Sequence, residues 1–289
     1  MTHPHSSRSS GMALIAVLWI VAALSIMVIG LSGTVRQQIQ IAGAQRDQVS
    51  GQALGEAAMA LALQELQSRD AREAGAVALT VSYGGHDISV EVVPLNGWIS
   101  LNGAGAPLLA ALLQTAGGLN AGAAGQLAAE LVAWRDGHPD VDPTAVGAAA
   151  VQARRFEAPE DLLLVPGVDY ALYARIAPLV TADLSGAGQV NPLAAPPGVL
   201  AVLAGGDSGR VAAYLNRRAS GQPGADATGF PSEFIGGGGT DVYRLRASVP
   251  LGEGKILLLT RDVALGAMYA RTAPWRILRT ERQILLPAA

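Results

Sequence analysis

The sequence contains no cysteine and a single lysine, Lys255, and only 4% of its residues are aromatic. The lack of cysteine excludes disulfides, thiolate zinc sites, iron–sulfur clusters and a cysteine nucleophile. Charge is scarce as well: 15% of the residues are charged, and 20 basic residues against 23 acidic ones give a formal net charge of −3. Because no run of basic residues is present to neutralise phosphates, we expect no nucleic-acid partner.

Apolar residues are abundant instead. Half of the 289 residues are hydrophobic, and the mean hydropathy is +0.32. This composition is far from that of a disordered chain. The length accommodates one large domain or two ordinary ones of roughly 100–200 residues each. The sequence therefore predicts a folded protein with a sizeable core.

One long apolar run lies near the N-terminus. From Met12 to Leu31 the chain carries no charge, and Ser25 is its only polar residue. As a helix this run would be about 30 Å long, the thickness of the hydrocarbon core of a bilayer. We predict a transmembrane helix over residues 12–31. A cleaved signal peptide is the alternative, with a weak cleavage-site match at Leu31-Ser32-Gly33. Basic residues lie on both sides of the run and do not settle its orientation.

The segment before the apolar run is short and polar and ends at Gly11, with Met12 directly after it. This arrangement resembles a type IV prepilin leader, which a membrane peptidase removes on the cytoplasmic side after a glycine before the new N-terminus is methylated. The resemblance implies a leader peptide over residues 1–11 and processing between Gly11 and Met12. The apolar helix would then be retained in the mature protein.

Counted from Met12, the fifth residue is Ala16. Most pilin-like subunits have Glu at this position, where its carboxylate neutralises the terminal ammonium of a neighbour inside an apolar filament core. An unpaired charge in such a core is costly. The loss of this Glu resembles the K-type minor pseudopilins of type II secretion (the GspK family), which stand at the tip of a short pseudopilus with no subunit above them.

The remaining pattern alternates between strands and helices. Small and apolar residues at helical spacing predict a helical stalk over 32–70. The alternating segment 79–93 turns at Gly84-Gly85 and predicts a β-hairpin. Further strands are predicted over 241–250, 254–263 and 274–286. The intervening stretch is rich in helix formers and predicts an inserted helical domain over 97–189, so that residues 71–96 and 190–289 together form an α/β head.

Four local motifs, in this order, resemble segments of the GspK family. They are Gly97–Asn102 before a helix, Trp134–Asp136, the helix–hairpin–helix segment Phe156–Gly167, and the turn at Gly188–Asn191 with the helix that follows it. The resemblance covers nearly the full length. It implies an α+β, pilin-like fold with a long N-terminal transmembrane helix, a small antiparallel sheet and a large inserted helical subdomain of helix–hairpin–helix or SAM-like type.

The stretch Leu163–Ile176 has a helix–hairpin–helix pattern, a shape that in DNA-binding proteins offers backbone N–H groups to a phosphate at the hairpin glycines. Asp169 occupies the position that a second glycine usually holds, where a phosphate would lie. Between residues 97 and 190, four arginines oppose nine acidic residues. Such a field repels a polyanion. The pattern therefore indicates a packing role.

Three carboxylates, those of Asp136, Asp140 and Asp142, fall within seven residues that also include Gly137 and Pro139. Oxygen donors in a flexible loop suit Ca²⁺ better than zinc or magnesium. The spacing is not that of an EF-hand, because the later bidentate Glu is missing. We predict a calcium site at these three aspartates, with a solvated acidic turn as the alternative. Calcium sites are also a feature of the family that the chain resembles.

Nothing in the sequence indicates catalysis: it has no nucleophile elbow, and its four histidines include no pair at metal-ligand spacing. We predict that the chain is not an enzyme. The resemblance implies a minor pseudopilin in the inner membrane, single-pass with its C-terminal head in the periplasm, that starts and caps the pseudopilus for protein export across the outer membrane. It also implies four protein partners: I- and J-type minor pseudopilins, the major pseudopilin and prepilin peptidase. The alternative is a membrane-anchored periplasmic binding or hydrolytic protein unrelated to pili, which predicts an uncut N-terminus or a cut near Gly33.

Overall fold

The computed structural model describes residues 10–68, 75–137, 155–184, 188–220, 227–266 and 274–286, without the side chains of residues 10, 11, 13, 26–37, 39, 40 and 253. The helices are α1 (Ser10–Ser68), α2 (Ala106–Thr115), α3 (Ala121–Asp136), α4 (Tyr170–Ile176), α5 (Pro197–Leu203) and α6 (Ser208–Ala219), with short 3-10 helices η1 (Leu95–Gly97), η2 (Pro159–Leu164), η3 (Ala177–Leu179) and η4 (Gly252–Gly254). The strands are β1 (Val77–Tyr83), β2 (His86–Pro94), β3 (Ile99–Ser100), β4 (Val180–Thr181), β5 (Val242–Pro250), β6 (Ile256–Leu265) and β7 (Trp275–Leu285).

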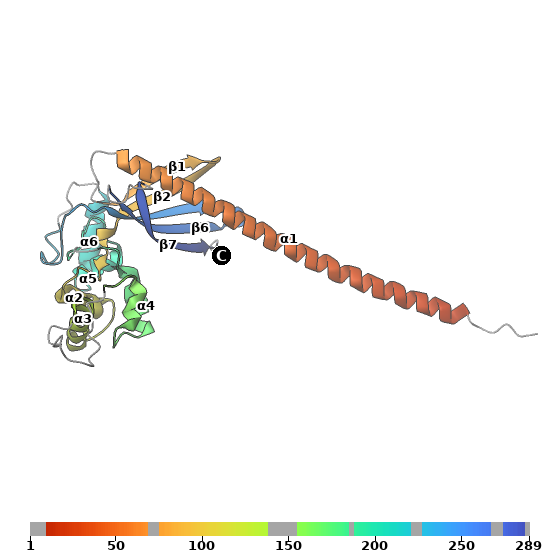
Figure 1. Ribbon diagram of the computed structural model, residues 1–289, viewed down its shortest axis with the longest axis horizontal. Coiled ribbons are helices and arrows are strands. Elements are labelled where there is room, and N and C mark those ends of the chain that lie inside the picture. The colour runs from red at the N-terminus through yellow and green to blue at the C-terminus, as the bar shows by residue number, and fades with distance from the viewer. Residues whose placement is uncertain are drawn as a thin grey trace, which may run out of the picture.

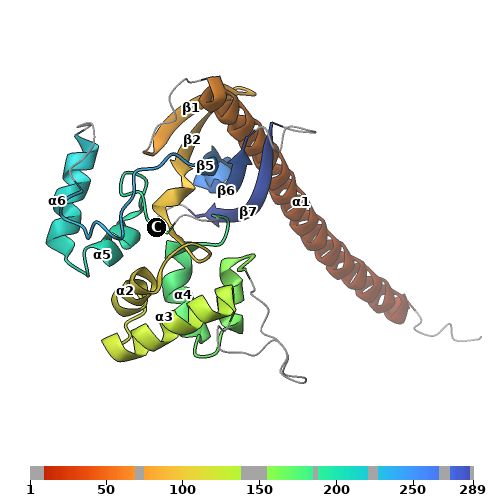
Figure 2. The ribbon, with the colours of Figure 1, turned by 60° about the vertical axis from the view of Figure 1, so that its left-hand side comes forward.

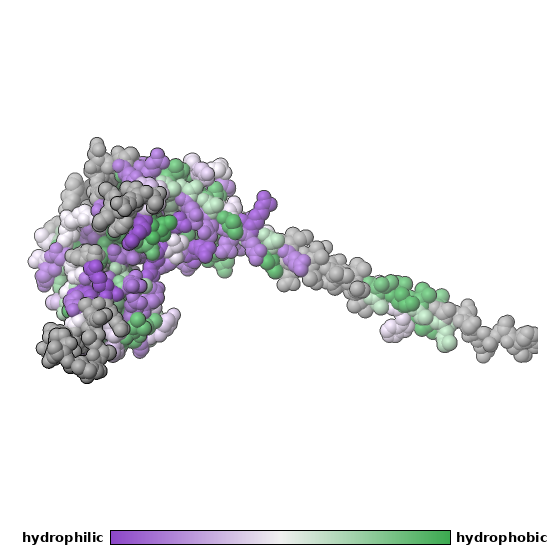
Figure 3. Space-filling view, in the orientation of Figure 1, coloured by the Kyte–Doolittle hydropathy of each residue, from purple (hydrophilic) through white to green (hydrophobic). Residues whose placement is uncertain are grey.

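Helix α1 is a continuous rod of 59 residues whose N-terminal half projects far beyond the rest of the molecule (Figure 1). Apolar side chains gather on the projecting half (Figure 3). The C-terminal half behaves differently, because Ala58, Met59, Ala62, Leu63 and Leu66 recur at helical spacing and are all buried against the sheet. The helix predicted over residues 32–70 is described as far as Ser68, and its last four turns belong to the core of the head.

Strands β1, β2, β5, β6 and β7 form one sheet in that spatial order, with every neighbouring pair antiparallel. Alternate residues of β5 lie under α1, and Tyr243, Leu245, Ala247 and Val249 are at most 2% exposed. The hairpin turn between β1 and β2 has positive φ at both central glycines, +60° and +80°, as a two-residue turn of this type requires. The α+β class, the hairpin and the antiparallel sheet are thus confirmed.

Two glycines allow α1 to lie close to the sheet. A Cβ atom at Gly51 would come within 2.5 Å of Leu251 Cδ2. A Cβ atom at Gly55 would lie 3.1 Å from Val249 Cγ2 and 3.3 Å from Leu259 Cδ2. These distances are shorter than ordinary carbon–carbon contacts of about 3.5–4.0 Å. Glycine at these positions thus sets how near the helix axis comes to β5 and β6.

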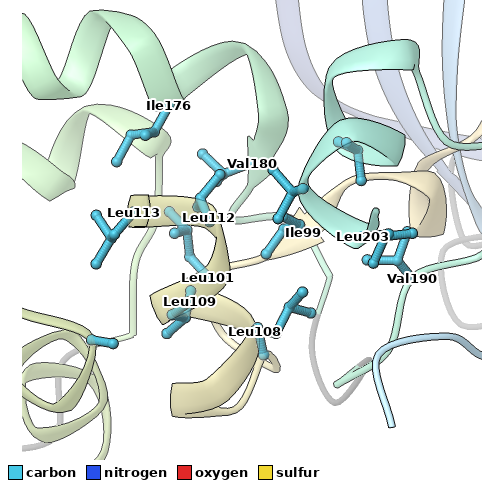
Figure 4. Packing of buried hydrophobic residues seen from close by; sticks show 14 of the residues in the cluster. Ile99, Leu101, Leu108, Leu109, Leu112, Leu113, Ile176, Val180, Val190 and Leu203 are labelled. Carbon is cyan, nitrogen blue, oxygen red and sulfur yellow. The ribbon is translucent and has the colours of Figure 1, made fainter. Parts of the chain in front are cut away.

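Helices α2 to α6 lie between β2 and β5 in the chain and beside the sheet in space (Figure 2). They have a hydrophobic core of their own, in which side chains from α2, α4, α5 and the short strands meet (Figure 4). Leu109, Leu113 and Ile176 are each at most 1% exposed within it. Strands β3 and β4 pair in parallel inside this part of the molecule.

The predicted domain boundary at residue 189 does not coincide with an edge of this core. Val199 and Leu203 of α5 and Tyr214 of α6 belong to the same hydrophobic cluster as Leu109 of α2. The helical part therefore continues to α6, and the chain returns to the sheet only at β5. The physical reason is that α5 and α6 have apolar faces, which are buried against α2 and its neighbours instead of against the sheet.

The close packing of α1 predicts that two glycine replacements change the free energy of unfolding in opposite directions. Gly55→Leu should lower the free energy of unfolding by about 1–3 kcal/mol, because the added side chain overpacks the contact with Val249 and Leu259. Gly43→Leu is the matched control, since a Cβ at Gly43 meets nothing within 4 Å. It should raise the unfolding free energy by up to about 1 kcal/mol through helix propensity. Urea unfolding of the full chain in detergent, followed by circular dichroism, measures both. Equal stability of the two variants would contradict this packing.

Candidate functional site

The first candidate site is the projecting half of α1. Met12 is 77%, Leu14 74% and Trp19 72% exposed, and Ile15, Val17, Leu18, Ile20, Val21 and Leu24 are exposed as well. These positions follow one another so closely that they cover every side of the helix. An amphipathic surface helix would have one apolar stripe only. This segment therefore has apolar surface all round that the head does not cover.

The processing and assembly residues predicted from the sequence lie at the start of this helix. Gly11 and Met12 fall in the first turn of α1, which begins at Ser10, and residues 1–9 lie outside the described residues. Ala16 follows one turn after Met12 and is exposed. Its side chain is a methyl group, so this position offers no carboxylate to a neighbouring chain. The roles of these three residues stay predictions.

Residues 12–31, the predicted membrane span, are helical throughout, but the side chains of residue 13 and of residues 26–31 lie outside the described residues. Among the residues that the structure describes, no helix meets the length and apolarity needed to cross a membrane.

The second candidate site is the junction between the sheet and the helical part. Arg244 of β5 donates to both carboxylate oxygens of Asp262 on β6, at 2.7 Å each, and Asp262 is 1% exposed. The Arg244 guanidinium also lies 4.5 Å from the centre of the Trp98 ring, a cation–π contact. Trp98 in turn donates from Nε1 to the carbonyl of Pro178 at 3.1 Å. A buried ion pair on the sheet is thus covered by a side chain of the helical part.

A second ion pair crosses the same junction. Arg279 of β7 donates to both carboxylate oxygens of Glu160 in η2, at 3.2 Å each. Burial alone would raise the pKa of Glu160, but the hydrogen bond and charge of Arg279 hold it below its ordinary value. A register shift in the pairing of β6 with β7, at Asp262/Val263, leaves Leu278 as an extra residue. This bulge aims Arg279 at the same face as Asp262, since it changes the alternation of side chains along the strand.

Asp183 adds a third carboxylate to the junction. Burial raises its pKa, the nearby charge of Asp262 raises it further, and Arg279, Arg244 and Arg276 act in the opposite direction. A cavity of 480 Å³ opens beside it, lined among others by Asp183, Arg276 and three glycines, Gly236, Gly238 and Gly239. The junction is therefore polar and incompletely filled.

The motif Gly97–Asn102 has structural roles at this junction. Asn102 Nδ2 donates to the carbonyls of Phe156 and Ala182 at 2.8 Å each, and its Oδ1 accepts from the Phe156 amide at 2.9 Å. Ser100 Oγ donates to the Leu184 carbonyl at 2.8 Å. A Cβ at Gly97 would collide with the backbone of Ala194. The motif thus holds together three distant segments of the helical part, those around β3, η2 and β4, through hydrogen bonds.

Asp169, in the helix–hairpin–helix segment, is the N-cap of α4. Its Oδ1 accepts from the amide of Leu172 at 2.7 Å. The carboxylate therefore stabilises the start of the helix, where an N-cap acceptor satisfies one of the free backbone N–H groups.

The predicted metal ligands are only partly described. Asp140 and Asp142 lie outside the described residues. Both carboxylate oxygens of Asp136 accept from Arg135, at 2.7 and 2.9 Å, and this hydrogen bond together with the charge of Arg135 lowers the pKa of Asp136 against a small effect of burial. Arg135 also donates to the carbonyls of Leu101 and Ala104. As placed, Asp136 does not present a free carboxylate to a cation, and within the described residues no three His, Asp or Glu side chains form a metal-binding group.

Sequence reasoning missed Arg244, Asp262 and Arg279. One sequence feature could have indicated this ion pair. Asp262 interrupts the apolar run of β6, and a carboxylate that is buried in a strand needs a partner. The partner could not be named without the register that places Arg244 directly opposite.

No protein-family model matches this sequence, and no curated protein matches it significantly. Among solved structures, a chain in the crystal structure of the GspK-GspI-GspJ complex from the type 2 secretion system of enterotoxigenic Escherichia coli is similar to it, with 16% identity and a TM-score of 0.49. The alignment covers 86% of this chain and 98% of that chain. That complex includes a protein of the family that the sequence motifs resemble.

The junction predicts that loss of the buried ion pair lowers the free energy of unfolding far more than loss of an exposed ion pair of the same sheet. Asp262→Ala should lower the free energy of unfolding by about 3–5 kcal/mol, because it leaves the Arg244 charge buried without its partner. Glu91→Ala is the control, since Glu91 and Arg246 are 44% and 41% exposed and 3.8 Å apart. It should cost less than about 1 kcal/mol. Urea unfolding of the full-length variants measures both, and similar losses would refute the assigned role of Asp262.

Proposed function

We propose that this chain is a K-type minor pseudopilin of a type II secretion system. It is held in the inner membrane by residues 12–31, with its head in the periplasm, and it starts and caps the pseudopilus. The observation that carries the proposal is the form of α1, in which an uncharged segment with uncovered apolar side chains between Met12 and Leu24 belongs to the same helix as the residues from Ala58 to Leu66 that pack on an antiparallel sheet (Figure 1). A lipid bilayer or a bundle of like helices is the surrounding that such an apolar half fits.

Processing follows from the position of the leader. Cleavage after Gly11 would release residues 1–11 and leave Met12 as a methylated N-terminus at the very start of α1. The helix would then begin with its apolar surface and carry no polar extension.

The tip position rests on Ala16 and on the helical part of the head. A subunit inside the fibre supplies a carboxylate to the ammonium of its neighbour, and a subunit with Ala16 cannot do so. The helical part extends the head away from the side on which α1 packs (Figure 2). Its bulk would obstruct a further subunit above it. The mechanism is therefore binding and geometry, and no catalytic step is assigned to this chain.

The partners proposed with this role are the I- and J-type minor pseudopilins, the major pseudopilin and prepilin peptidase. The family motifs between Gly97 and Asn191 support the first two, because they define the helical part that distinguishes the K type. Calcium binding by Asp136, Asp140 and Asp142 stays a prediction, and no part of the proposed assembly depends on it.

Cleavage of the leader is the direct test. The full chain with a C-terminal affinity tag, produced beside active prepilin peptidase, should lose residues 1–11 and begin at a methylated Met12, whereas inactive peptidase should leave Met1 in place. Intact-mass measurement and N-terminal sequencing report both. Gly11→Val should block the cut because the peptidase requires glycine before the scissile bond.

Gly33→Val is the matched control and should leave this processing unchanged. The reverse result, a cut near Gly33 that Gly33→Val prevents, would support the alternative of a secreted or anchored periplasmic protein unrelated to pili. An N-terminus that remains uncut with active peptidase would also contradict the proposal.

Restoring the missing carboxylate tests the tip position. Ala16→Glu should move a measurable share of the protein from the fibre end to positions along the shaft, because the new carboxylate can neutralise the terminal ammonium of the subunit above. Ala16→Gln is the control, with nearly the same shape and no charge, and should stay at the end. Immunogold labelling of pseudopili measures both distributions. Wild-type protein found along the whole shaft would refute a tip role.

A further inference from the structure

The free edge of β7 is the surface with the clearest unused binding capacity. β7 lies at one end of the sheet order, and within the described parts of the chain no strand pairs with its outer edge. It is 11 residues long, against 7 for β1 at the opposite edge. An open edge presents a row of backbone N–H and C=O groups that fit one kind of partner, another extended chain.

Apolar side chains accompany this open edge. Ile277 is 46%, Ile284 43% and Leu285 39% exposed, and β7 contains no proline. Ile277 and Ile284 pair with Val263 and Leu257, which are buried under α1, so both lie on the α1 face of the sheet. The edge therefore combines unpaired backbone groups with uncovered apolar surface.

A cavity of 180 Å³ lies beside this edge, between β7 and α1. Its walls include Met59 and Leu63 of α1 and Trp275 and Ile277 of β7, and Arg261 of β6 lines it as well. Arg261 donates from Nη2 to Glu56 at 2.6 Å, but its buried Nε–H has no hydrogen-bond partner. A buried donor without an acceptor is costly. The cavity thus has room for one apolar side chain and a donor for one acceptor.

The charge of the last three strands indicates which kind of partner fits this edge. From Val242 to the C-terminus the sequence has eight basic residues against three acidic ones, whereas the chain as a whole carries −3. Arg276, Arg279 and Arg282 lie on β7 itself together with Glu281, and Arg279 is paired with Glu160 and Glu281. Arg282 donates to the neutral Oε1 of Gln52 at 2.7 Å. This edge is therefore complementary to an acidic strand.

A second copy of this chain fits less well. The β1 edge of a second copy is uncharged. Two β7 strands paired about a two-fold axis would make the two α1 helices run in opposite directions, since the axis would stand perpendicular to the shared sheet. Helices anchored in one membrane cannot do so. The occupant is instead a different subunit whose anchor is parallel to α1.

We propose that the free edge of β7 pairs with an acidic strand of a neighbouring pilin-like subunit, and that one apolar side chain of this strand enters the cavity between α1 and β7. This inference rests on the proposed function, because it takes the neighbour to be another minor pseudopilin. The strand extends the sheet through backbone hydrogen bonds, and its carboxylates face Arg282.

Crosslinking locates the contact. A photoreactive amino acid at Ile284 of the full chain, co-expressed with the I- and J-type minor pseudopilins, should give a crosslink to one of them, and mass spectrometry should map it to an acidic extended segment. The same group at Leu164, 63% exposed on the helical part, and at Tyr83, 48% exposed on β1, should not crosslink to that segment. A crosslink to lipid, or a product between two copies of this chain, would overturn the proposal.

Substitutions test the energetics. Ile284→Lys and Arg282→Glu should each raise the Kd for the co-purified I- and J-type pair at least tenfold, and Leu164→Lys should leave it unchanged. Melting temperatures within the error of wild type show that the variants are folded, and Arg282→Lys, which keeps the charge, should retain most of the affinity. If wild type binds the pair and the β7 variants bind equally well, this inference fails and the proposed function stands. If wild type does not bind the pair, both fail.

Discussion

The contact between the C-terminal half of α1 and the sheet is the constraint on which the rest of the molecule depends. Gly51 and Gly55 bring the helix so close that larger residues would displace Leu251 or overpack Val249 and Leu259. The centre of the contact is apolar and belongs to one hydrophobic cluster, and toward β7 Arg261 and Arg282 bond to Glu56 and Gln52 of the helix. Since α1 is one uninterrupted helix, this contact also holds the projecting apolar half in a defined direction relative to the head.

The opposite face of the sheet carries the charged contacts with the helical part. Arg244 and Asp262 lie on the face away from α1, because their neighbours Tyr243, Leu245 and Val263 are the residues buried under the helix. A buried pair of this kind is weak support for stability, but it is demanding in geometry, since both partners must be in place. With Trp98 over the guanidinium and Glu160 held by Arg279, it sets how the helical part meets the sheet. The two parts of the head are therefore joined by directional contacts, and each keeps its own core.

Charge is also divided between the two parts. The helical part is acidic, and the last three strands are basic. The ion pair between Arg279 and Glu160 joins the basic sheet to the acidic helical part within the molecule. On the edge strand β7, Arg276 and Arg282 are exposed, and their positive charge favours an acidic neighbour and disfavours a like one.

The sequence alone was enough to predict a helix over residues 12–31, the hairpin at Gly84-Gly85 and the three late strands, because each depends on local periodicity and turn chemistry. It also indicated a helical region after Trp98. It could not predict where that region ends, because α5 and α6 are assigned by the core they share with α2, and that core joins residues far apart in the chain. Nor could it place Asp136 against Arg135 or Asp262 against Arg244. Local pattern determines which elements form and which faces are apolar. Only the tertiary structure decided which half of α1 is covered, which buried charges are paired and which strand edge is left open, because these depend on register and on contacts between distant segments.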